Sequence, residues 1–147
     1  MEENGGSKNF GAYLDRTLRK VRLDMGRRLK ESGVDITPEQ WMILSSLYEN
    51  NGQSQTELGD GSFKNAPTVS RIIDLLCKKG LAERRPDRND RRRHNIFLTT
   101  KGKKIVEKAF PAIIATREKG WEGLSDDDYK IFLRIINQIF ENFEDIK

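Results

Sequence analysis

The chain has 147 residues, of which 34% are charged and 35% hydrophobic, and its formal net charge is +4. This length predicts one domain, or slightly more, with a core that needs no disulfide or metal for stability. No apolar run approaches the roughly 18 residues of a membrane span, and residues 1–7 lack the apolar segment of a secretory signal. We therefore expect no membrane partner. The single cysteine, Cys77, cannot form an internal disulfide, which fits the cytoplasmic location that we expect.

Charge is distributed unevenly along the chain. Residues 64–104 hold 13 Lys/Arg against 4 Asp/Glu, whereas residues 118–147 hold 4 Lys/Arg against 8 Asp/Glu. The basic middle segment indicates contact with a polyanion such as nucleic acid, and the acidic end indicates a different role. A solvated basic surface without a nucleic-acid partner is the alternative interpretation.

The hydrophobic pattern predicts four helices in the first half of the chain. The first covers residues 10–29, where apolar residues recur every three or four positions. A second helix, over residues 37–50, begins at a capping box that starts with Thr37. A short third helix follows over residues 54–62, and a fourth covers residues 65–80.

The fourth predicted helix has one apolar face and one small, polar and basic face. Asn65 caps it, and Pro67 lies in its first turn, where a missing N–H matters little. Arg71 points away from the apolar side, and a capped helix with such an outer face can enter the major groove of a DNA duplex. The alternative for Arg71 is an ion pair with Asp74 or Glu83. The expected core stripe consists of Val69, Ile72, Ile73 and Leu76.

Two strands and two further helices are predicted after residue 80. The strands, at residues 81–85 and 94–98, flank a turn segment that contains Arg91, Arg92 and Arg93. We therefore expect a β-hairpin whose basic tip reaches phosphate or the minor groove. A fifth helix starts at Thr99 or Thr100 and should kink at Pro111, and a sixth starts after the cap residue Ser125.

This order of elements predicts a mainly α fold with a small β-hairpin wing. A winged helix-turn-helix domain at residues 34–111 would bind DNA, and residues 1–8 would form a flexible tail. Residues 9–33 and 112–147 would form a helical dimerisation region, because the first and last helices are too apolar for an isolated chain. The residues expected at the dimer contact are Phe10, Leu14, Leu18, Phe132, Ile136, Ile139, Phe140 and Phe143.

Several short motifs occur in a characteristic order and spacing. They are Thr37-Pro38-Glu39-Gln40-Trp41, Gln55-Thr56-Glu57-Leu58, Pro67-Thr68-Val69-Ser70-Arg71-Ile72-Ile73-Asp74, Lys78-Lys79-Gly80-Leu81, and Arg85-Pro86-Asp87 continuing through Asp90-Arg91-Arg92 to Leu98-Thr99. In this order they resemble the MarR family of bacterial transcription regulators. Ser62, Phe63 and Lys64 depart from the apolar–glycine–apolar pattern that is common there.

The resemblance implies a homodimer that binds a pseudo-palindromic operator and is controlled by a small-molecule effector or an oxidant, and we expect it to be a repressor. It further implies that Thr68, Ser70 and Arg71 meet bases and phosphates, and that Asp90 braces Arg92 for the minor groove. A winged-helix protein-interaction module without specific DNA binding is the alternative. The expected DNA-binding residues are Gln55, Lys64, Asn65, Pro67, Thr68, Ser70, Arg71, Arg88, Asp90, Arg91, Arg92 and Arg93.

Other chemistry has little support in the sequence. No catalytic set, metal-ligand spacing or phosphate-binding glycine loop occurs, so we expect neither an enzyme nor a cofactor. Cys77 lies near a helix C-terminus, which disfavours a thiolate, and its redox activity is left open. An effector pocket between the DNA-binding and dimerisation regions would be lined by Met25, Trp41, Phe110 and Ile113, for which packing in the core is the alternative.

Overall fold

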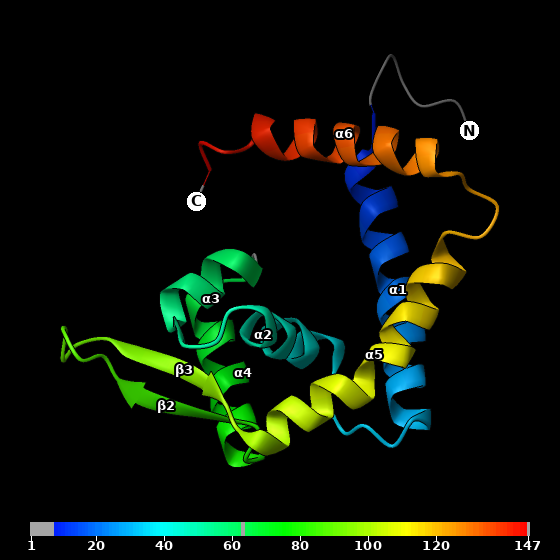
Figure 1. Ribbon diagram of the computed structural model, residues 1–147. Helices are drawn as coiled ribbons and strands as arrows, with labels where there is room; N and C mark the ends of the chain where they lie inside the picture. The colour runs from blue at the N-terminus through cyan, green and yellow to red at the C-terminus, as the bar shows by residue number, and fades with distance from the viewer. Residues whose placement is uncertain (1–7, 63, 147) are drawn as a thin grey trace. The chain divides into compact units, whose positions relative to one another are not determined.

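The computed structural model describes residues 8–62 and 64–146. Residues 1–7 of the tail expected at residues 1–8 lie outside the described residues, and so does Phe63. The chain divides into two compact units, with the boundary between Thr116 and Arg117. The mainly helical fold with a β-hairpin is confirmed. Its elements are α1 (Phe10–Glu31), α2 (Pro38–Glu49), β1 (Gln53–Ser54), α3 (Gln55–Ser62), α4 (Ala66–Lys78), β2 (Ala82–Pro86), β3 (His94–Leu98), α5 (Thr100–Gly120) and α6 (Asp126–Asn142) (Figure 1).

The described sheet has three antiparallel strands, in the order β1-β3-β2, rather than the two that the sequence predicts. The hairpin strands pair from Ala82 opposite Leu98 to Pro86 opposite His94. The additional strand, β1, places Ser54 opposite Asn95. The prediction missed β1 because two residues are too short to show an alternating pattern, and because Ser54 also carries the signal for a helix start.

Side-chain caps define where α2 and α6 begin, as predicted. Thr37 Oγ1 accepts a hydrogen bond from the Gln40 backbone N–H at 3.1 Å, and Gln40 Oε1 accepts one from the Thr37 N–H at 3.1 Å. Ser125 and Asp128 form the equivalent reciprocal pair at the start of α6. Each cap satisfies backbone donors that the helix itself leaves unpaired and contributes about 1 kcal/mol.

The core of the first unit holds α4 by its apolar face. Val69, Ile72, Ile73 and Leu76 are all buried, which confirms the predicted stripe. Burying a side chain of this size stabilises the fold by roughly 1.5–3 kcal/mol, so the opposite face of α4 must turn outward. The same core contains, from the other elements, Leu29, Ile43, Leu44, Leu47, Leu58, Ile96, Val106 and Ile113.

A close approach between α5 and the residue before β2 requires a glycine. A Cβ at Gly102 would lie 2.0 Å from the carbonyl oxygen of Leu81. Thr99 Oγ1 closes the same junction, since it accepts from the Gly102 N–H at 3.0 Å and donates to the Gly80 carbonyl at 2.6 Å. The base of the hairpin is therefore packed directly on the start of α5.

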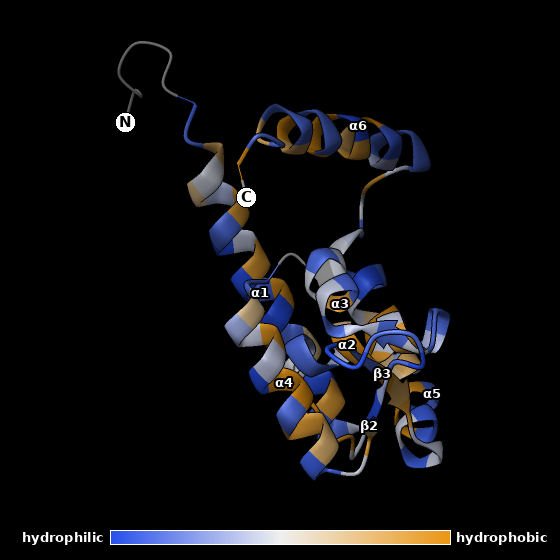
Figure 2. Ribbon diagram, turned by 90° about the vertical axis from the view of Figure 1, so that its left-hand side faces the viewer, coloured by the Kyte–Doolittle hydropathy of each residue, from blue (hydrophilic) through white to orange (hydrophobic). Residues whose placement is uncertain are grey.

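The second unit, from Arg117 onward, contains the end of α5, a turn and α6. The helix α5 continues through Pro111 to Gly120 as a single element. The ring of Trp121 meets those of Tyr129 and Phe132, with centroids 5.2 and 5.8 Å apart. Hydrophobic and hydrophilic residues interleave along α6 as in an amphipathic helix (Figure 2), and none of its described residues is buried.

None of the helices in the described part of the chain combines the length and the hydrophobicity of a transmembrane span.

Candidate nucleic-acid interface

The outward side of α4 carries the helix residues that the sequence predicts at a DNA contact. Asn65 Oδ1 accepts a hydrogen bond from the Thr68 N–H at 2.9 Å, so Asn65 is confirmed as the cap of this helix. Thr68 and Ser70 are half-buried, whereas Arg71 is exposed. The cap thus fixes the helix start, and the first two turns present a short polar surface with one cation.

Arg71 forms neither of the ion pairs, with Asp74 or Glu83, that the sequence allows for it. Arg84 Nη2 lies 2.6 Å from Asp74 Oδ1, and Arg85 forms an ion pair with Glu83. Both acidic candidates are therefore bound by arginines of β2. No ion pair of Arg71 occurs within residues 8–62 and 64–146. Its guanidinium is available to a ligand outside the chain.

The hairpin turn is held by one aspartate. Asp87 Oδ1 accepts from the Asn89 N–H at 2.8 Å, and its Oδ2 accepts from Asn95 Nδ2 at 3.2 Å. These two hydrogen bonds, the first being the stronger effect, lower the pKa of Asp87. The carboxylate therefore stays charged and holds the turn at neutral pH.

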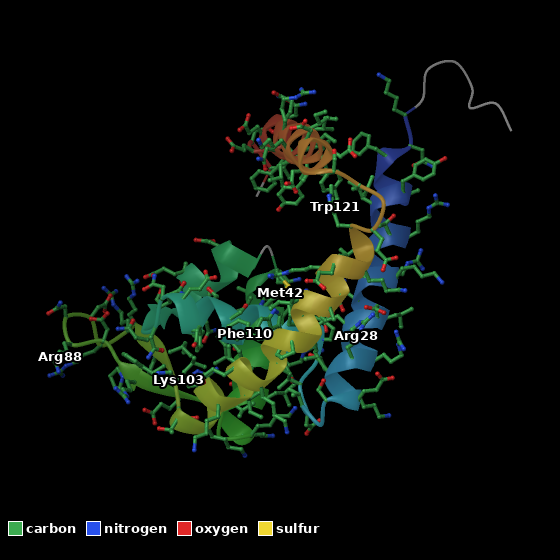
Figure 3. The ribbon with its side chains drawn as sticks, turned by 45° about the vertical axis from the view of Figure 1, so that its right-hand side comes forward. Arg28, Met42, Arg88, Lys103, Phe110 and Trp121 are labelled. Atoms are coloured by element: carbon green, nitrogen blue, oxygen red, sulfur yellow. The ribbon has the colours of Figure 1, made fainter. Side chains whose placement is uncertain are left out.

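Arg88 lies at the tip of the hairpin, whereas Lys103 of α5 lies near the opposite end of the hairpin (Figure 3).

The acid–arginine pair in the turn is present. Asp90 Oδ1 accepts from the Arg92 backbone N–H at 3.0 Å, and Arg92 Nε lies 3.6 Å from the same oxygen. The Arg92 side chain is nevertheless 94% exposed, so this contact orients the guanidinium without covering it. Arg88 and Arg91 are exposed beside it. The turn thus presents three accessible cations.

Arg93 is bonded differently from the other turn arginines. Its guanidinium forms an ion pair with Glu57 of α3, and its Nε lies 4.0 Å from Asp87 Oδ2. Glu57 is itself fixed, because it accepts from Ser54 Oγ at 3.1 Å. Arg93 therefore links the hairpin to α3. No sequence pattern indicates this contact, because its two residues are 36 positions apart.

The remaining predicted DNA contacts lie at helix starts. Gln55 is half-buried as the first residue of α3, where backbone N–H groups favour a phosphate. Lys64, half-buried, immediately precedes the cap of α4, and Pro67 is exposed in the first turn of α4. These three residues therefore lie in or beside the first turns of the two consecutive helices.

The four residues predicted at an effector pocket pack together in the core. Trp41 and Ile113 are buried, and Met25 and Phe110 pack against the same cluster. The Phe110 ring meets the edges of Trp41 and Tyr48, with centroids 5.5 and 5.4 Å apart. An open cavity of about 450 Å³ adjoins this cluster, with Tyr48 and Lys103 in its lining. The effector role of the four residues stays a prediction.

Two alternative chemistries receive no support from the described residues. Burial is the main reason why the pKa of the Cys77 thiol is raised, so this side chain stays protonated at neutral pH. No group of three or more His, Cys, Asp or Glu within the described part of the chain could hold a metal ion.

Known proteins share both the sequence and the fold of this region. A sequence model of the MarR family matches residues 34–93, from the residues before α2 to the end of the hairpin turn. Residues 34–93 of the chain belong to the MarR family. This family consists of transcription regulators rather than enzymes.

Solved structures extend the likeness over nearly the whole length of the chain. MepR from S. aureus, solved as a DNA complex, is 25% identical, with 92% of this chain and 99% of that chain covered and a TM-score of 0.83. A protein of unknown function from Listeria innocua Clip11262 is 32% identical, with 92% and 93% covered and a TM-score of 0.66. PcaV from Streptomyces coelicolor, solved with its natural ligand, is 20% identical, with 98% and 100% covered and a TM-score of 0.83. At 20% identity the likeness to PcaV concerns the fold alone.

Proposed function

We propose that this MarR-family protein is a homodimeric transcription repressor of the cytoplasm that binds a pseudo-palindromic operator. The observation that carries the proposal is the free, outward guanidinium of Arg71 on a capped helix, next in the chain to a wing with three accessible arginines. Helix and wing together supply both kinds of contact that a sequence-specific DNA-binding protein needs, which are base contacts and phosphate contacts.

In this proposal α4 is the recognition helix and enters the major groove. Thr68, Ser70 and Arg71 then face base edges and nearby phosphates, while Arg92, oriented by Asp90, reaches the minor groove. Gln55, Lys64, Asn65, Pro67, Arg88, Arg91 and Arg93 complete the interface, with Arg93 also bracing the wing. Two such protomers would place their recognition helices about 34–36 Å apart, one turn of duplex.

The proposed dimer contact consists of apolar residues that are exposed or half-buried in a single protomer. On α1, Phe10, Leu14 and Leu18 are 42%, 40% and 47% exposed. On α6 and just after it, Phe132, Phe140 and Phe143 are 44%, 54% and 52% exposed, and Ile136 and Ile139 are half-buried. Burial of these side chains in a second copy would remove an apolar surface from water that a monomer would expose. Residues 9–33 and 112–147 thus form the proposed dimerisation region, and residues 34–111 the DNA-binding domain.

We further propose that a small-molecule effector releases the protein from DNA. Its site would involve Met25, Trp41, Phe110 and Ile113, which connect α1, α2 and α5 through one packed cluster. A ligand that displaces the Phe110 ring from Trp41 would disturb α2, which packs against the DNA-binding helices. Quenching of Trp41 fluorescence in a Trp121→Phe variant, which leaves one tryptophan, would report such a ligand.

The decisive experiment is selection of bound duplexes from a random library with the purified protein. We expect a two-fold symmetric consensus, and sedimentation of a dimer at micromolar concentration both with and without that duplex. A protein-interaction module on the same fold would instead bind no duplex even at low salt. Sedimentation as a monomer at these concentrations would contradict the dimer.

A further inference from the structure

The Lys79 side chain connects the C-terminal end of the recognition helix to the start of α2. Lys79 Nζ donates to the Asp35 carbonyl oxygen at 2.7 Å and to Gln40 Oε1 at 3.2 Å. Asp35 Oδ2 lies 3.8 Å from the same nitrogen. The partners are 44 and 39 positions away in the chain, so this is a tertiary contact and not a local cap.

The oxygen of Gln40 that receives Lys79 is itself fixed. Gln40 is only 6% exposed, and its Oε1 also accepts from the Thr37 N–H as part of the capping box of α2. The carbonyl oxygen of Lys79 in turn accepts from Lys101 Nζ of α5 at 3.0 Å. Lys79 therefore joins the end of α4 to α2 and α5 through polar contacts, of which the one to Gln40 ends on a buried, hydrogen-bonded oxygen.

We propose that Lys79 is a positioning residue that sets the direction of the recognition helix and thereby its discrimination between DNA sequences. This inference rests on the proposed DNA-binding function. Lys79 lies eight residues beyond Arg71, or about 12 Å along the helix, so it touches no base that Arg71 meets. Without its side-chain contacts, α4 keeps the apolar stripe, the Asp74–Arg84 ion pair and the Lys101 contact to the Lys79 carbonyl. Neither of these polar contacts ties the end of the helix to the start of α2, so small rotations of α4 become easier.

Such rotations affect specific and non-specific binding differently. Base contacts need donors and acceptors within hydrogen-bond distance and at the correct angle, whereas attraction to phosphates depends mainly on the number of cations. Loss of the Lys79 contacts should therefore weaken binding to the operator much more than binding to a random duplex.

Lys78 provides a matched control. It is the last residue of α4, it is exposed, and its replacement by methionine removes the same charge from the same end of the helix. Lys78→Met should therefore weaken binding to operator and random duplex by the same small factor. Any selective loss in Lys79→Met then arises from the broken contacts and not from the charge.

The test measures fluorescence anisotropy of the full-length protein with the operator that the wild type selects and with a random duplex of equal length. For Lys79→Met we expect a loss of roughly 3- to 30-fold on the operator and less than about twofold on the random duplex. Lys79→Arg, whose guanidinium can reach the same oxygens, should restore most of the operator-to-random ratio. Thermal unfolding measures whether each variant is folded. If Lys79→Met does not fold, Lys79→Gln, which is uncharged and shorter than lysine, takes its place in the assay.

An unchanged operator-to-random ratio in Lys79→Met would overturn the inference while leaving the proposed function intact. Equal ratios for Lys78→Met and Lys79→Met, both below the wild type, would overturn it as well, because charge alone would then explain the loss. A wild type that prefers no duplex in the selection refutes the proposed function, and this inference with it.

Discussion

Asp24 of α1 accepts a hydrogen bond from the hydroxyl of Thr116 of α5, and the two oxygens are 2.8 Å apart. The same carboxylate accepts from Arg28 Nε at 2.8 Å and from Arg27 Nη2 at 2.9 Å. One acidic group on the first helix thus bonds to a residue 92 positions later in the chain. It attaches α1 to α5 within the first unit, beside the apolar contacts of Leu29.

This attachment should make stability depend on pH. The hydrogen bond from Arg28, followed by those from Thr116 and Arg27, lowers the pKa of Asp24 well below its ordinary value. A lowered pKa in the folded state stabilises the protein above the unfolded pKa of about 3.9, and this contribution is lost as pH falls toward the folded value. We expect Asp24→Asn to be less stable than the wild type at pH 7, with a difference that shrinks in acid.

Urea unfolding between pH 7 and pH 3 measures this difference. Asp15→Asn is the matched control, because Asp15 lies on the same helix in an ion pair with Arg19 whose side chains are 70% and 71% exposed. Exposed pairs of this kind contribute little, so the control should follow the wild type across the range. Parallel curves for Asp24→Asn and the wild type would contradict the predicted role of Asp24.

Replacement of Arg71 by alanine should weaken operator binding by roughly 1–3 kcal/mol if its guanidinium reaches a base. The free energy of unfolding should change little, since Arg71 is exposed and both acidic groups near it are bound by Arg84 and Arg85. Anisotropy titration with the selected operator measures the first quantity, and urea unfolding measures the second. Unchanged operator binding would remove Arg71 from the interface.

The wing arginines 92 and 93 should behave differently when each is changed to alanine. Arg92→Ala should reduce DNA affinity and lower the salt-dependence slope by about 0.9 if one phosphate contact is lost, with no change in Tm. Arg93→Ala should also lower Tm slightly, because it breaks the link to Glu57. The same loss of Tm in both variants would instead make Arg92 a structural residue.

The two roles considered for Asn65 can be separated by two substitutions. Asn65→Ala removes the cap of α4 and should cost about 1 kcal/mol of unfolding free energy. Asn65→Asp keeps an acceptor for the Thr68 N–H and should preserve stability, but it places a negative charge where DNA is expected and should weaken binding. Urea unfolding and anisotropy measure the two effects, and a stable alanine variant would disprove the capping role.

Local features of this chain were predictable from the sequence because they depend on residues within one or two turns. The caps at Thr37, Asn65 and Ser125, the apolar stripe of α4 and the two hairpin strands belong to this class. The acid–arginine pair of Asp90 and Arg92 was expected instead from the resemblance to the MarR family.

Contacts between distant residues could not be predicted in this way. The pairs Arg93–Glu57 and Lys79–Asp35 depend on how the hairpin and α4 fold back onto earlier helices. A sequence pattern contains only the spacing along the chain, and charged residues on a solvated face have the same pattern as charged residues in a brace. The different role of Arg93 could therefore not be predicted from the run of arginines at residues 91–93.

The smallest element, β1, has a mechanical consequence. Ser54 lies opposite Asn95 in the sheet while its hydroxyl accepts from the Glu57 N–H at 3.1 Å, so one residue belongs both to the wing and to the start of α3. The Gly52 N–H, bonded to the Ile96 carbonyl at 3.0 Å, secures the connection from the other side. The hairpin is thus attached to α3 and does not move independently of it. A force that bends the hairpin is therefore transmitted to α3, and the two elements move together.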